Sequence, residues 1–221
     1  MRFSEELRRD ADPIFQSIRN HPFVQGIQQA SLGRDQIVHY VQQDYLYLTT
    51  YAKVYGLGLA KCRTREEMQD FHRRIGFILN DEVHPHITLC RVAGVSYESL
   101  QVGATLAPTA QHYMSHMLLC AQTGSLGEVL ATVLPCHWTY VDLATDIMAR
   151  DAPTADHPFY DWIAFYAARD MQVGLADLCG WIDNYAATAG EEDKLRMRAA
   201  FMVSCQLERR FFEMAYSLEK W

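Results

Sequence analysis

Apolar residues recur with the period of an α-helix along almost the whole chain, and this pattern restricts the possible folds most strongly. Strict alternation of apolar and polar residues, which is typical of strands, is scarce, and so are Asn-Gly hairpin signals. We therefore expect an all-α protein of seven to nine helices. No repeat, low-complexity tract or linker interrupts the pattern. One helical domain is expected over residues 1–221.

Polar residues and glycines mark the ends of the expected helices. Thr64 followed by Glu66 and Glu67 is typical of a helix start, because acidic side chains stabilise the positive end of the helix dipole. We expect that helix to continue to about residue 92. A later helix begins near residue 109, and Gly124 is expected to end it in the left-handed conformation.

Composition limits the possible partners and the compartment. The net charge is −7, with acidic and basic residues intermixed, which argues against a nucleic-acid partner. No basic amphipathic stretch or long apolar run indicates a membrane. The six cysteines are widely spaced, and the charged start Met1–Glu6 does not resemble a signal peptide. We expect reduced thiols and a cytoplasmic location.

An aspartate lies within an apolar helical stripe. Asp44, Tyr47 and Tyr51 are spaced i, i+3 and i+7, so they share one helix face. A carboxylate buried there needs hydrogen bonds, or else its pKa rises. Asp44 is therefore either a ligand-binding group or a structural residue that hydrogen-bonds a nearby tyrosine and holds the core together.

A cysteine follows a proline inside an expected helix. Pro135 cannot donate a backbone hydrogen bond, so a kink is expected that presents Cys136 at an irregular point. Tyr140, four residues later, shares its face. Cys136 would be a nucleophile if its pKa is lowered. The alternative is a small buried apolar residue, the usual role of a free cysteine.

An acid and several phenols complete the candidate residues. Glu208 lies near the helix face of Cys205 and Phe212, where it is expected to point inward. A desolvated glutamate exchanges protons near neutral pH, although a buried ion pair with an arginine would explain it equally. Tyr113 and Tyr166 suit either a pocket or the core. One thiol, two acids and several phenols would suit covalent chemistry on a small polar ring.

A metal site is not expected. Glu82 and His86 are spaced i, i+4, but Pro85 disturbs the turn and no second such pair exists. Di-iron bundles use Glu-x-x-His pairs from two helices. His112 and His116 also form an i, i+4 pair, without a glutamate between them. The sequence contains no HExxH, P-loop, GxGxxG or nucleophile-elbow serine.

Taken together, several segments resemble the thiaminase II (TenA) family, in order and over nearly the whole chain. They are HPFVQGI (21–27), QDYLYL (43–48), PTA and YMSHM within 108–117, LPCHW (134–138), and Glu208 with Phe211 and Met214–Tyr216. The resemblance implies the all-helical fold of haem oxygenase, a homotetramer, no cofactor and no metal. It also implies hydrolysis at the methylene carbon on the 4-amino-2-methylpyrimidine ring.

The substrates implied by the resemblance are thiamin and 4-amino-5-aminomethyl-2-methylpyrimidine, and the product is the 5-hydroxymethyl pyrimidine. We favour the aminomethyl compound, as part of thiamin salvage. Matching positions place the nucleophile at Cys136, which assigns the chain to the cysteine branch, and the ring-protonating acid at Glu208. Asp44 matches the residue that holds the amino group and the adjacent ring nitrogen. The matching pocket phenols are Tyr47, Tyr113, Tyr140 and Tyr166.

The chain departs from the family pattern at two places. His137 follows the cysteine where an aromatic residue is common, and Arg209 and Arg210 follow Glu208 where less charged residues are expected. Two other functions stay open: a catalytically silent pyrimidine-binding or regulatory protein, and a metal-dependent oxidase on the same fold. The complete set of acids and thiol favours an enzyme, because binding alone needs no nucleophile.

Overall fold

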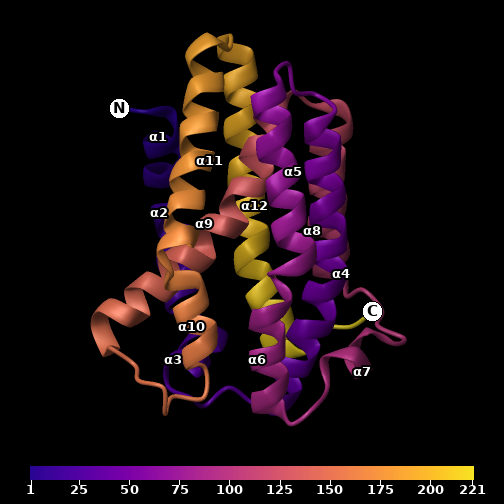
Figure 1. The fold of residues 1–221 in the computed structure, drawn as a ribbon, viewed down its shortest axis with the longest axis vertical. Coiled ribbons are helices and arrows are strands. Elements are labelled where there is room, and N and C mark those ends of the chain that lie inside the picture. The colour runs from indigo at the N-terminus through magenta and orange to yellow at the C-terminus, as the bar shows by residue number, and fades with distance from the viewer.

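The computed structural model describes all residues, 1–221, and every regular element in it is an α-helix (Figure 1). The all-α prediction is confirmed, with twelve helices instead of seven to nine. In chain order they are α1 (Phe3–Asp10), α2 (Asp12–Arg19), α3 (Pro22–Gln28), α4 (Arg34–Leu59), α5 (Arg65–Asn80), α6 (Val83–Ala93), α7 (Tyr97–Gln101), α8 (Pro108–Thr123), α9 (Leu126–Asp151), α10 (Tyr160–Ala167), α11 (Arg169–Thr188) and α12 (Glu191–Ser217).

The helix expected from Thr64 to about residue 92 is divided in two. Thr64 does cap α5, in a reciprocal capping box with Glu67, but α5 ends at Asn80 and α6 begins at Val83. Pro85 explains the break, because inside a continuous helix it would leave a backbone carbonyl unpaired, whereas in a first turn it costs no hydrogen bond. The break places Glu82 and His86 at the start of a new helix.

The prediction for Gly124 is wrong. Its φ of −88° and ψ of 178° are extended, not left-handed. Ser125 immediately caps α9, in a capping box with Glu128, so the chain runs straight into the next helix start. Gly94, by contrast, ends α6 in the left-handed conformation, with φ 66°.

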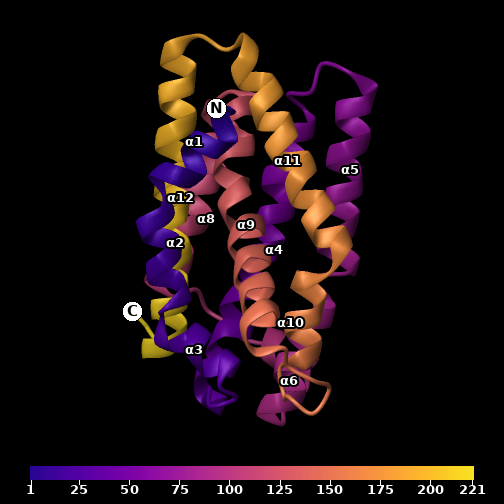
Figure 2. The ribbon, with the colours of Figure 1, turned by 90° about the vertical axis from the view of Figure 1, so that its left-hand side faces the viewer.

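Helix α9 lies in the middle of the molecule, against α4, α8, α10, α11 and α12. The longest helices run roughly along the long axis, and the short helices α3, α6 and α10 gather towards one end (Figures 1 and 2). The buried apolar side chains form one connected core. None of the helices combines the length and apolar character that crossing a bilayer requires.

Candidate active site

A pocket opens beside the middle of α9, where four other elements meet it. It is narrow, about 20 Å³, which is room for about one water molecule. A ring therefore enters only when side chains of the lining move. The lining consists of Asp44, Leu48 and Tyr51 from α4, Glu82 before α6, Cys136, His137 and Tyr140 from α9, Tyr166 from α10, and Met171 from α11.

The structure brings four of the seven predicted site residues into this inner pocket: Asp44, Cys136, Tyr140 and Tyr166. The other three, Tyr47, Tyr113 and Glu208, do not line it. They form a buried group close enough to Cys136 for their charges to affect one another. The fold thus places residues from five helices around one thiol. The first and last of them, Asp44 and Glu208, are more than 160 positions apart in the sequence.

Asp44 is held by a histidine, not by a tyrosine as the structural interpretation expected. Its side chain is buried, and Oδ2 lies 2.7 Å from Nε2 of His86. Nδ1 of His86 lies 3.2 Å from the Tyr97 hydroxyl. With the proton on Nε2, His86 donates to Asp44 and accepts from Tyr97, so each polar atom of the chain is satisfied. Oδ1 of Asp44 keeps its acceptor capacity for a ligand.

Glu208 is buried on α12, with 3% of its surface exposed. The Tyr113 hydroxyl donates to Oε1 at 2.7 Å. The pKa of Glu208 is raised to about 8, because burial and the charge of Asp44 outweigh the opposing hydrogen bond from Tyr113. No arginine pairs with Glu208, since Arg209 and Arg210 are exposed, so the ion-pair interpretation is wrong. The glutamate is therefore mostly protonated at neutral pH.

Cys136 lies on α9, which continues through Pro135 without a break. The Tyr51 hydroxyl donates to the Val133 carbonyl at 2.8 Å, close to this proline. Burial raises the pKa of the Cys136 thiol well above its usual value, and the charges of Glu208 and Glu82 raise it further. The lowered pKa that would make Cys136 a ready nucleophile is not found. At neutral pH the thiol is therefore almost entirely protonated.

Aromatic rings surround the thiol. Tyr140 hydrogen-bonds Tyr40 through the two hydroxyls, and its ring centroid lies 4.9 Å from that of Tyr166. The Tyr47 ring lies 5.0 Å from Tyr113, and its buried hydroxyl has no hydrogen-bond partner. A buried hydroxyl without a partner is uncommon, and it leaves Tyr47 free to bond a ligand or the thiol.

Sequence reasoning missed Glu82 and His86 as site residues. Their i, i+4 spacing was considered only as a metal pair. In the structure His86 holds Asp44, whereas Glu82 lines the inner pocket. No three His, Cys, Asp or Glu side chains are grouped so that they could hold a metal ion. His137 is structural: Nε2 donates to the Met171 carbonyl at 2.8 Å, and burial lowers its pKa to about 4, so the ring stays neutral.

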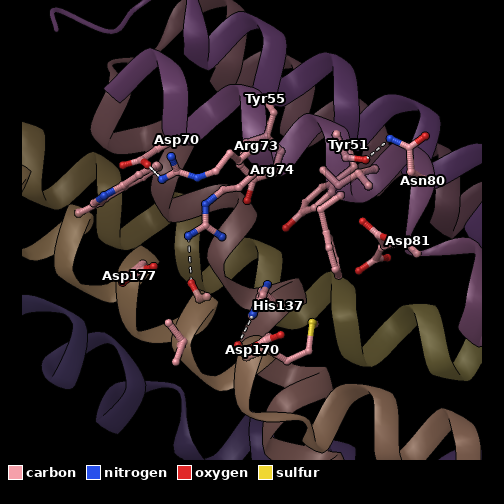
Figure 3. A pocket seen from close by; sticks show the side chains of 18 residues that line it. Tyr51, Tyr55, Asp70, Arg73, Arg74, Asn80, Asp81, His137, Asp170 and Asp177 are labelled. Carbon is pink, nitrogen blue, oxygen red and sulfur yellow. Dashed lines mark hydrogen bonds and ion pairs between the residues drawn. The ribbon is translucent and has the colours of Figure 1, made fainter. Parts of the chain in front are cut away.

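A larger outer pocket of about 720 Å³ adjoins the inner one, between α4, α5 and α11. Four residues line both pockets: Tyr51, Glu82, His137 and Met171. Figure 3 shows Arg73 and Arg74 at one side of the outer pocket, Asp81 at the other, and His137 between them. The shared residues lie between the outer pocket and the inner pocket that contains the thiol.

Comparison with known proteins decides the family. Residues 8–218 match the profile of the TENA/THI-4/PQQC family. The chain belongs to this family. A relative from Halalkalibacterium halodurans, named aminopyrimidine aminohydrolase, is 36% identical over 100% of this chain and 98% of its own length. A Helicobacter pylori protein of the same name is 33% identical over 98% of this chain and 99% of its own. The predicted family is confirmed.

Solved structures give the same result for the fold of this family member. The TenA homologue from P. horikoshii OT3 superposes with a TM-score of 0.86 at 25% identity, over 98% of this chain and 99% of that one. Heme oxygenase 2 from Chlamydomonas reinhardtii gives a TM-score of 0.59 at 11% identity, over 96% of this chain and 97% of its own. The second likeness concerns the fold alone, and it confirms the predicted haem oxygenase-like architecture.

Proposed function

We propose that this protein is an aminopyrimidine aminohydrolase of the cysteine branch. It converts 4-amino-5-aminomethyl-2-methylpyrimidine, and thiamin, into 4-amino-5-hydroxymethyl-2-methylpyrimidine and thereby serves thiamin salvage. The observation that carries the proposal is the meeting of Cys136 and Asp44 in one pocket, with Glu208 adjacent to the thiol. The names of the relatives from H. halodurans and H. pylori support it.

Asp44 fixes the ring in register. Its Oδ1 accepts a hydrogen bond from the 4-amino group, while His86 keeps the carboxylate oriented through Oδ2. The rings of Tyr140 and Tyr166 supply apolar and aromatic surface for the pyrimidine. Direct displacement at the methylene carbon is slow with poor leaving groups, so binding alone does not give turnover.

The first chemical step joins the thiol to the ring. Protonated Glu208 donates to ring nitrogen N1, and the resulting carboxylate takes the proton of the Cys136 thiol as sulfur bonds to C6. The thiol proton is thus relayed to N1, and neither a ring anion nor a free thiolate accumulates. This is nucleophilic catalysis assisted by a general acid, and the acid contributes roughly 10²–10⁴-fold.

The adduct then exchanges its leaving group for water. Electrons of the C4–C5 double bond form a bond to the methylene carbon. The amine nitrogen takes up a proton and leaves as ammonia, whereas thiamin releases the neutral thiazole. Water adds to the exocyclic methylene and loses a proton. Sulfur leaves C6 as the N1 proton returns through Glu208 to the thiol, which restores Cys136 and the aromatic ring.

The decisive experiment compares the two substrates directly. Purified protein is incubated separately with the aminomethyl pyrimidine and with thiamin, and the hydroxymethyl product is quantified by chromatography. We expect turnover of both, with the higher kcat/KM for the aminomethyl compound. Tight binding of the pyrimidine without turnover of either substrate would instead support the silent binding protein.

We further propose that the protein acts as a homotetramer in the cytoplasm. Leu119 on α8 and Leu195 and Val203 on the adjoining α12 are exposed apolar residues, which suit a subunit contact. All six cysteines are free thiols, which suits a reducing compartment. Light scattering after size-exclusion chromatography should give four times the 25.4 kDa of one chain.

A further inference from the structure

Glu82 is an acid of the inner pocket that the steps above do not use. It precedes α6 and lines the inner pocket together with Cys136 and Tyr140. It also lines the outer pocket, so the residue lies between the two pockets. Its surroundings differ from those of the other two acids, because Asp44 is held by His86 and Glu208 by Tyr113.

The protonation state of Glu82 suits a proton donor. Burial and, to a lesser extent, the nearby charge of Asp44 together raise its pKa to about 8, and no hydrogen bond opposes the rise. At neutral pH the Glu82 carboxyl group is therefore protonated in most molecules. A protonated carboxyl group at this position can donate a hydrogen bond or a proton to a bound ligand.

The shape of the substrate leaves the third acid one place to act. In an aminopyrimidine, N1 and the 4-amino group lie on opposite sides of the ring, and C5 carries the reacting methylene between C4 and C6. A ring with Glu208 at N1 and Asp44 at the amino group offers neither acid to the C5 substituent. Of the three acids, Glu82 is the one that lines both pockets, on the side where a C5 substituent would face the larger outer pocket.

We propose that Glu82 is the general acid for the amine leaving group. This inference rests on the proposed function. The Glu82 carboxyl group donates its proton to the amine nitrogen as the carbon–nitrogen bond breaks, and ammonia departs. The carboxylate then accepts a proton from the water that adds to the methylene, which regenerates the acid. The balance is one aminomethyl pyrimidine and one water converted to one hydroxymethyl pyrimidine and one ammonia.

Thiamin provides an internal control for this assignment. Cleavage of its carbon–nitrogen bond returns an electron pair to a cationic ring, so the thiazole leaves neutral and requires no proton. A neutral amine needs one, because amide ion is a very poor leaving group, and the assignment concerns the substrate bound with its amine neutral. A variant without the acid should therefore lose activity with one substrate and keep it with the other.

The test is the variant Glu82→Gln, which keeps the size of the side chain. With the aminomethyl pyrimidine kcat should fall about 100-fold, the size typical for a lost general acid, and with thiamin by less than about fivefold. The matched control is Asp81→Asn, since Asp81 is the adjacent carboxylate and lines only the outer pocket. It should leave the ratio of the two rates unchanged.

Three outcomes would overturn the inference, and only the last of them also overturns the proposed function. Equal losses with both substrates in Glu82→Gln, or no loss with either, would show that Glu82 is not the donor to the amine while the proposed function stands. A wild-type protein that turns over neither compound would refute the proposed function, and the role of Glu82 would be refuted with it.

Discussion

Replacing Glu208 by glutamine should change how stability depends on pH, because the structure makes its charge costly. The pKa of the Glu208 carboxyl group in the folded protein is about 8, against an ordinary value of 4.5. A carboxyl group with a raised folded-state pKa contributes full stability below the ordinary pKa and loses it as pH rises to the folded value. Glu208 therefore destabilises the fold progressively between pH 4.5 and 8, as the unfolded chain ionises first.

The size of the effect follows from about 1.4 kcal/mol for each pKa unit. Ionisation of Glu208 lowers the free energy of unfolding by about 2 kcal/mol at pH 6 and about 5 kcal/mol at pH 9. Glutamine has no such dependence and keeps an acceptor for the Tyr113 hydroxyl. The stability of Glu208→Gln relative to wild type should thus rise by about 3 kcal/mol from pH 6 to pH 9.

Urea unfolding followed by circular dichroism measures this difference at both pH values, at one fixed protein concentration. The control is Glu192→Gln, whose wild-type side chain is 89% exposed and should show no change between the two pH values. If the difference in unfolding free energy between Glu208→Gln and wild type is the same at both pH values within about 0.5 kcal/mol, the raised pKa of Glu208 is refuted. The proposed role as a proton donor depends on that raised pKa.

Three further changes have defined outcomes. Cys136→Ser should lower kcat by more than about 10³-fold and keep pyrimidine affinity; near-wild-type turnover would remove the covalent step. Asp44→Asn keeps an acceptor for His86 but turns a donor towards the 4-amino group, so calorimetry should show about 10- to 100-fold weaker binding of the hydroxymethyl pyrimidine; unchanged affinity would place the amino group elsewhere. Gly58→Ala brings a methyl group to 2.4 Å from the Phe71 ring and should cost about 1–3 kcal/mol in thermal unfolding, whereas Gly56→Ala, with nothing within 4 Å, should gain about 0.5–1 kcal/mol; equal effects would contradict the close α4–α5 packing.

Local sequence signals determined the class of the fold and several of its boundaries. Helical periodicity is a property of neighbouring residues, so the all-α architecture needed no tertiary information. The same is true of the caps at Thr64 and Ser125, since a capping box joins residues only three apart. The segment matches also sufficed for the family, because their order along the chain is itself a sequence property.

Contacts between distant segments decided the rest. Nothing near Asp44 in the chain indicates that His86 holds it, because the two residues meet only where α4 packs on α6. The same holds for the bond from Tyr113 to Glu208, which joins α8 to α12. Sequence spacing was misleading for Glu82 and His86, since His86 bonds Asp44 and Tyr97 while Glu82, before the start of α6, lines the pocket.

The residue types that carry chemistry are therefore fixed by the sequence alone: a thiol after a proline, two acids in apolar stripes and a set of phenols. Their protonation states are not, because a pKa depends on desolvation and on charges that the fold gathers from remote segments. Packing around α9 is what raises the pKa values of Glu208, Glu82 and Cys136 together. The same close packing also makes the inner pocket narrow. Its width depends on contacts between side chains from different helices, which the sequence pattern does not specify.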